Sequence, residues 1–160
     1  MASLLPNDAV AISIGACLGA LSRYHTGRLA AEYIAADPNK LGILQGWHTA
    51  AINVCGSFVL GCVAGSPTAA ATNCAPKPKS AAPPSSLLPL SFGGLSPRAK
   101  LMLGVGFCGS FTTFSTFSVD VVTWLSKGQT AKALTYVMVN NVGGVAAAAS
   151  GLMLVRKLFG

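Results

Sequence analysis

The chain has 160 residues, of which 52% are apolar and only 9% carry a charged side chain. Soluble domains usually have about 25% charged residues, so water is a poor solvent for most of this sequence. The formal net charge is +7. The basic residues are scattered near expected helix ends and form no stripe, which argues against nucleic acid as a partner. The five cysteines show no CxxC spacing, so neither a disulfide framework nor a zinc site is indicated.

Long apolar runs separated by charged clusters predict membrane helices, because about 18 or more such residues can cross a bilayer. The runs cover residues 9–21, extended past Arg23 and Tyr24, then 47–65, 101–125 and 133–155. No Lys or Arg precedes the first run, so the basic segment of a cleavable signal peptide is missing and we interpret this run as a retained span. The sequence therefore predicts an all-α integral membrane protein with four transmembrane helices.

Residues 66–99 differ in composition, being rich in Ala, Pro and Ser with Lys77 and Lys79. Such a segment cannot bury enough apolar surface to fold alone, so we expect a loosely ordered extramembrane loop. It separates residues 1–65, which contain helices one and two, from residues 100–160, which contain helices three and four.

Basic residues are divided almost evenly between the two sides that four spans define. The side of the termini has Lys77, Lys79, Arg98, Lys100, Arg156 and Lys157, and the other side has Arg23, Arg28, Lys40, Lys127 and Lys132. Orientation normally follows an excess of Lys and Arg in cytoplasmic loops. Chance in a small chain is one explanation; we favour insertion in both orientations and an antiparallel homodimer, since two-fold dimers are the commonest assemblies.

The third run contains the most informative stretch, residues 104–118. Gly104, Gly106 and Gly109 weaken a helix, and the hydroxyl-rich segment that follows is costly in hydrocarbon unless it is buried. Broken backbone at membrane depth is tolerated where it lines a cavity, and its freed carbonyls can coordinate a cation. We therefore predict a third helix broken near the midplane, with the backbone carbonyls of Gly109 and Thr112 as ligands for a cation.

Aromatic and hydroxyl side chains follow this predicted break. Phe111, Phe114 and Phe117 recur every third residue and are expected on one broad face. The neighbouring hydroxyl groups belong to Thr112, Ser115 and Thr116. Aromatic edges are electropositive and hydroxyls are donors, so together they offer the moderate attraction that an anion pore requires.

Other polar residues in the apolar runs have two possible roles each. Asn53 either donates its amide to an anion or forms a helix-to-helix hydrogen bond. Tyr136 is an interface anchor or a pore hydroxyl. Arg23 is a snorkelling anchor or draws anions into a vestibule. Asp120 either caps the pore region or pairs with a base.

Small residues at helical spacing, such as Gly15 with Gly19 and Gly61 with Gly65, let membrane helices approach closely. We interpret them as packing residues. They carry no functional prediction of their own.

Three motifs make the chain similar to a known family: GACLGALSRY (residues 15–24), NVCGSF (53–58) and GFCGSFTTFSTFS (106–118). With these the chain resembles the Fluc (CrcB-type) fluoride channels and their eukaryotic fluoride-export relatives. The resemblance implies a passive, fluoride-selective channel in the cell membrane that exports cytoplasmic fluoride. It also implies an antiparallel dual-topology homodimer with a structural Na⁺ at its centre, held by backbone carbonyls of Gly109 and Thr112.

The same resemblance assigns site residues by position. It assigns the paired aromatic rings to Phe114 and Phe117, the pore amide to Asn53, the polar track to Ser115, Thr116 and Tyr136, and the vestibule to Arg23. The chain departs from the pattern at Ser110, where a second Gly is common, and at Asp120, where Glu is usual. The 66–99 loop is longer than in bacterial members.

Two other membrane functions and an enzyme are the alternatives to a channel. A proton-coupled four-helix exporter needs an intramembrane carboxylate, whereas Asp8 and Asp120 fall toward span ends and Glu32 and Asp37 in an expected loop. A structural membrane protein explains the small residues and leaves the phenylalanine and hydroxyl array unexplained. No nucleophile with a paired base or phosphate-binding loop is visible, so we do not expect an enzyme.

Overall fold

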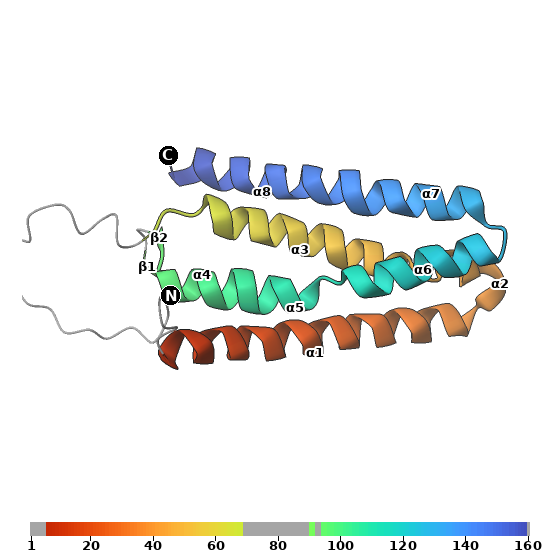
Figure 1. Ribbon diagram of the computed structural model, residues 1–160, viewed down its shortest axis with the longest axis horizontal. Helices are drawn as coiled ribbons and strands as arrows, with labels where there is room; N and C mark the ends of the chain where they lie inside the picture. The colour runs from red at the N-terminus through yellow and green to blue at the C-terminus, as the bar shows by residue number, and fades with distance from the viewer. Residues whose placement is uncertain (1–5, 69–89, 92–93, 160) are drawn as a thin grey trace, which may run out of the picture.

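The computed structural model describes residues 6–68, 90–91 and 94–159, which form a bundle of long helices aligned along one axis (Figure 1). The first two helices are α1 (Pro6–Ala36) and α3 (Trp47–Gly65). The third stretch comprises α4 (Pro97–Lys100), the π-helical segment η3 (Leu101–Cys108), α5 (Gly109–Phe111) and α6 (Phe114–Ser126). The fourth comprises α7 (Thr130–Met138), the π-helical segment η4 (Val139–Gly143) and α8 (Gly144–Phe159).

Short elements connect the helices. α2 (Pro38–Leu41) and η1 (Gly42–Leu44) join α1 to α3, and β1 (Leu90–Ser91) pairs antiparallel with β2 (Gly94–Leu95) before α4. Helix α1 begins and helix α8 ends at the same end of the bundle as β1 and β2 (Figure 1). Most of the predicted 66–99 loop, residues 69–89 and 92–93, lies outside the described residues.

Among the described residues, three helical stretches are long and apolar enough to cross a membrane: Trp47–Gly65, Pro97–Ser126 and Thr130–Phe159. The protein is therefore an all-α, multi-pass membrane protein. The first predicted span is not among these three, because α1 combines its apolar segment with charged residues.

Helix α1 is longer than the sequence predicted. It continues to Ala36, so Arg23 lies in the interior of the helix, and Glu32, which was expected in a loop, is helical. The extension is favoured by the Arg28–Glu32 ion pair, whose Nη2–Oε1 distance is 2.8 Å at the i, i+4 spacing. Hydropathy alone missed it, since this segment is charged and still favours a helix.

Glycines allow the long helices to approach each other closely. Gly15 and Gly19 of α1 lie against backbone atoms of η3, and Gly61 of α3 lies against the backbone of Ala148 in α8. A Cβ atom at any of these positions would collide with main-chain atoms, which cannot rotate away. The packing interpretation of these glycines is confirmed.

We expect Gly61→Ile to lower the free energy of unfolding by about 3 kcal/mol, because overpacking against backbone forces α3 away from α8. The measurement is thermal unfolding of the detergent-solubilised protein. Gly42→Ala is the matched control, since no atom lies within 4 Å of the Cβ position at Gly42. Equal unfolding midpoints for Gly61→Ile and the wild type would contradict this account of the packing.

Candidate functional site

Two extended residues interrupt the third helical stretch near its centre. Thr112 (φ −76°, ψ 156°) and Thr113 (φ −148°, ψ 119°) separate α5 from α6, and the interruption is visible in Figure 1. Thr113 begins α6 as its N-cap, because its Oγ1 accepts a hydrogen bond from the backbone N–H of Thr116 at 3.3 Å. The predicted break in this helix is confirmed.

Asn53 of α3 holds this break. Its Nδ2 donates to the Thr113 carbonyl at 3.1 Å and to Oδ1 of Asn140 at 2.9 Å, and its Oδ1 accepts from the Thr113 N–H at 2.8 Å. A primary amide has two donor hydrogens, and both are used here. Of the two roles considered for Asn53, the helix-to-helix hydrogen bond is thus present in the structure.

These side-chain bonds deprive two carbonyls of their helical partners. In an α-helix the Thr113 N–H would donate to the Gly109 carbonyl, and the Thr116 N–H to the Thr112 carbonyl. The two N–H groups donate instead to Asn53 Oδ1 and Thr113 Oγ1. Gly109 is exposed and Thr112 half-buried. Backbone carbonyls freed in this way at a broken helix are suited to coordinating a cation such as Na⁺.

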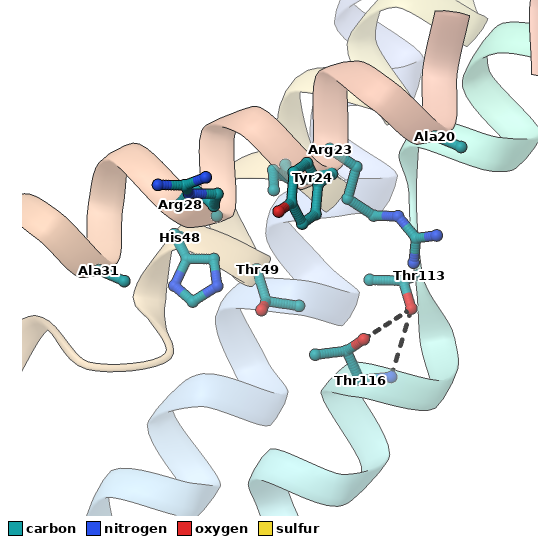
Figure 2. Close-up of a pocket in the computed structure, with 11 residues that line it drawn as sticks. Ala20, Arg23, Tyr24, Arg28, Ala31, His48, Thr49, Thr113 and Thr116 are labelled. Atoms are coloured by element: carbon teal, nitrogen blue, oxygen red, sulfur yellow. Dashed lines mark hydrogen bonds between the residues drawn. The ribbon is translucent and has the colours of Figure 1, made fainter. Parts of the chain in front are cut away.

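A pocket of about 500 Å³, here called the arginine pocket, lies between α1, the start of α3 and the start of α6. Figure 2 shows its lining side chains, with Arg23 extending towards Thr113 and Thr116, and His48 near Thr49. Its charged or titratable lining residues are Arg23, Tyr24, Arg28 and His48. The pocket therefore has a positive electrostatic character.

A second pocket of about 220 Å³, here called the asparagine pocket, lies between α3, the break and η4. Its lining includes Asn53, Phe114, Phe117, Asn140 and Asn141. Thr113 lines both pockets. The broken backbone thus lies where a positively charged cavity and an amide-rich, aromatic cavity meet.

The phenylalanine rings are arranged differently from the predicted single face. Phe114 and Phe117 on α6 have ring centroids 5.4 Å apart with planes tilted by 44°, and both reach the asparagine pocket. Phe111 precedes the break and stacks on Phe107 at 5.5 Å. The prediction of one face for all three was wrong, because two extended residues interrupt the helical period between Phe111 and Phe114.

The two rings of this pair differ in burial. Phe114 is 76% exposed, whereas Phe117 is 8% exposed and stacks on Tyr136 with centroids 5.4 Å apart. Phe117 is therefore anchored within the helix bundle. Phe114 projects from it.

Hydroxyl groups cluster at the start of α6. Thr113 Oγ1 lies 3.2 Å from Ser115 Oγ and donates to Thr116 Oγ1 at 3.1 Å. Thr116 lines the arginine pocket, and both Ser115 and Thr116 are exposed in the single chain. This cluster offers hydroxyl donors beside the break.

Tyr136 lies away from both pockets. It is fully buried among aromatic rings, with the Trp124 centroid 4.6 Å away, and its hydroxyl donates to Asp120 Oδ2 at 2.9 Å. Asp120 thus has Tyr136 as its partner, in contrast to the base considered from the sequence. This hydrogen bond and the stacking on Phe117 join α6 to α7.

Sequence reasoning missed three residues at this site: His48, Thr49 and Thr113. The Thr113 N-cap had a local signal, since a threonine before a helical segment can accept from an N–H three residues on. His48 had no such signal, because only the fold brings it to the cavity between α1 and α3. Asn53 was singled out, but its partner Asn140 is 87 residues away and nothing in one sequence pairs them.

Comparison with known proteins fits this arrangement. The family model described as "CrcB-like protein, Camphor Resistance (CrcB)" matches residues 10–152, which include both pockets and the break. The chain belongs to the CrcB family. Two CrcB relatives, each named "Fluoride-specific ion channel FluC", come from Hyphomonas neptunium and Novosphingobium aromaticivorans. The first is 32% identical over 96% of this chain and 98% of its own length, and the second is 37% identical over 91% and 93%. A FluC from Gloeobacter violaceus is 29% identical over 94% of this chain and 98% of its own length.

Proposed function

We propose that this CrcB family protein is a fluoride-selective ion channel that lets cytoplasmic fluoride leave passively down its electrochemical gradient. Curated relatives that align with more than nine-tenths of the chain carry the name of a fluoride-specific channel. The structural observation that carries the proposal is the broken helix, whose Thr113 lines a positive pocket on one side and an aromatic, amide-lined pocket on the other. The proposed process is ion permeation, in which no covalent bond is made or broken.

The two pockets provide graded attraction for an anion. Arg23 and Arg28 raise the local anion concentration in the arginine pocket. The hydroxyls of Thr116 and Ser115 then offer neutral donors, and the edges of Phe114 and Phe117 offer weakly positive ring hydrogens. No Asp, Glu, Lys or Arg is among the described residues that line the asparagine pocket. A path of this kind attracts an anion without trapping it, as conduction requires.

Asn53 and Tyr136 hold the residues that line this path in position. Asn53 fixes the backbone at Thr113 through two hydrogen bonds, so its amide determines the position of the hydroxyl cluster. Tyr136 provides the surface on which Phe117 stacks. We assign both residues to the pore as residues that set its shape.

The working unit is an antiparallel homodimer. Phe114, Ser115 and Thr116 are exposed in the protomer near the centre of a membrane-spanning stretch. Hydroxyl groups at that depth are unfavourable against lipid and need protein around them. A second, inverted copy would cover them and complete the wall of each pore, and the nearly even distribution of basic residues supports insertion in both orientations.

In this dimer α1 serves as the fourth membrane span. It packs along η3 and α5 through Gly15 and Gly19, and both of those elements belong to a membrane-crossing stretch. A helix that lies in contact with the centre of the bundle must itself be at membrane depth. Its Arg23 then faces the arginine pocket, where water and anions solvate the charge.

The carbonyls of Gly109 and Thr112 would hold a structural Na⁺ ion at the dimer centre. Both carbonyls have lost their helical N–H partners, and oxygen atoms are the ligands a hard cation prefers. When bound, Na⁺ would neutralise these carbonyl dipoles and join two copies of the break. The chain's own contribution is to keep the carbonyls free, which Asn53 and the Thr113 hydroxyl accomplish.

Removing sodium is expected to abolish fluoride efflux from reconstituted vesicles, because an unneutralised cluster of carbonyls destabilises the dimer centre. The measurement compares Na⁺ with a large organic cation on both sides of the membrane, at equal ionic strength. Restoring Na⁺ should restore the flux. Equal flux in the two media would contradict the sodium site and leave the channel itself unaffected.

Growth of a bacterium that lacks its own fluoride channel tests the proposed function in cells. Expression of the wild-type chain is expected to restore growth in fluoride, and Phe114→Ile is not, although both proteins reach the membrane in equal amounts. A proton-coupled drug exporter would leave fluoride sensitivity unchanged and confer resistance to cationic drugs, and that result would reject the proposal.

A further inference from the structure

His48 lies in the arginine pocket and has no role in the pathway described above. It occupies the first turn of α3 and is half-buried. Its ring packs on α1, because a Cβ placed on Gly27 would lie 3.8 Å from His48 Nε2. Figure 2 shows the ring at the end of the pocket near Arg28 and Thr49.

The Nδ1 atom of His48 is buried and has no hydrogen-bond partner within the described part of the chain. Buried polar atoms in folded proteins are nearly always hydrogen-bonded, so an exception needs an explanation. Nδ1 is covered by protein and an ion in the cavity cannot reach it, so the ring meets the cavity through its other edge, where Nε2 lies beside Gly27, which also lines the pocket. No protein group fixes which nitrogen carries the proton.

The charged groups that line the pocket are positive. Arg23 and Arg28 face it from α1, together with the neutral Tyr24. Glu32, also on α1, pairs with Arg28 at 2.8 Å where both side chains are 60% exposed. A protonated His48 would therefore add a third positive charge to the pocket.

The carboxylate on the α6 side is already engaged. Asp120 Oδ2 lies 3.7 Å from a Cβ placed on Gly46, near the start of α3, and accepts the Tyr136 hydroxyl. Asp120 does not line the arginine pocket, and α6 contributes only the hydroxyls of Thr113 and Thr116 there. Within the described residues the pocket lining thus holds no negative charge to balance a protonated imidazole.

We propose that His48 is a proton-linked anion ligand, so that the arginine pocket takes up a fluoride ion and a proton together. This inference rests on the proposed channel function. Protonation makes both ring nitrogens donors and adds a positive charge, which strengthens anion binding. By reciprocity, a bound anion favours the protonated ring by the same free energy.

The consequence is a channel that responds to acidity. Fluoride crosses membranes as neutral HF from acid surroundings and releases a proton when it ionises inside, so fluoride load and acidity rise together. In an antiparallel pair one arginine pocket opens to each side of the membrane. Fluoride entry from either side therefore increases as the pH on that side falls.

Fluoride current through planar bilayers at low fluoride concentration tests the inference, because neutral HF carries no current. Wild-type current is expected to rise roughly tenfold between about pH 8 and about pH 5, the range in which histidine changes charge and the scale on which charge in a cleft alters ion entry. His48→Gln keeps a polar group without a titration, so its current should not vary with pH in this range.

His25→Gln is the matched control. His25 is exposed on α1, packs edge-on against Tyr24 with centroids 5.6 Å apart, and does not line the pocket. This variant should retain the full pH dependence.

The outcomes separate the inference from the proposed function. A wild-type current that is flat with pH, or a His48→Gln current that rises as the wild type does, overturns the role of His48 and leaves the channel function standing. Absence of wild-type fluoride current at every pH contradicts the channel function itself. Should His48→Gln fail to fold, His48→Asn provides the same comparison, because asparagine is well accommodated near a helix N-terminus.

Discussion

Replacing Asn53 with leucine is expected to abolish fluoride transport and to lower the free energy of unfolding by about 2–4 kcal/mol. The substitution removes the hydrogen bonds to Thr113 and leaves its N–H and carbonyl without partners in a part-buried location. To regain a partner, the Thr113 N–H would have to return to the Gly109 carbonyl, and the break would then lose the geometry on which both pockets depend. Thermal unfolding in detergent and fluoride efflux from vesicles measure the two effects.

Asn140→Ala provides the graded comparison for Asn53. It removes one acceptor of the Asn53 amide at 2.9 Å and leaves both bonds to Thr113 in place. We expect a loss of about 1 kcal/mol, the net value of one hydrogen bond, and a partial loss of transport. If Asn53→Leu matched Asn140→Ala in both measurements, Asn53 would not be the residue that holds the break.

The two phenylalanines of α6 are expected to separate transport from stability. Phe114→Ile should eliminate fluoride efflux with little change in protomer stability, because the side chain is 76% exposed in the protomer. Phe117→Ala should destabilise the protomer by about 3–5 kcal/mol, since it removes a buried ring that stacks on Tyr136. Unfolding midpoints and efflux rates of the two purified variants give the comparison.

Leu134→Ala serves as the control for this pair, because Leu134 is 60% exposed on α7 and lines neither pocket. Its efflux should match that of the wild type. Normal efflux through Phe114→Ile would show that the exposed ring is not part of the ion path.

The sequence predicted the features that depend on local composition. Three of the four apolar runs fall in stretches that can cross a membrane, and the glycines and hydroxyls of residues 104–118 indicated a broken helix, which the structure has at Thr112 and Thr113. Small residues indicated close helix packing, as at Gly61 and Ala148. Each of these follows from one segment and its solvent, so no knowledge of tertiary contacts is needed.

Features that depend on contacts between helices could not be predicted in the same way. The sequence could not decide whether the Asn53 amide donates to an anion or forms a helix-to-helix hydrogen bond, because its partner Thr113 is 60 residues away. Tyr136 was placed on a polar track by resemblance, whereas the fold buries it behind Phe117 and satisfies its hydroxyl with Asp120. Arg23 was read as lying near the end of a span, because the helical continuation to Ala36 is too polar for a hydropathy signal.

Fluoride efflux from liposomes containing this chain alone, read with a fluoride electrode, is the direct test of a fluoride-selective channel. We expect rapid fluoride release that Phe114→Ile abolishes, with no chloride release from matched chloride-loaded vesicles. Vesicles that hold folded wild-type protein and retain their fluoride would contradict it, as would equal release of fluoride and chloride.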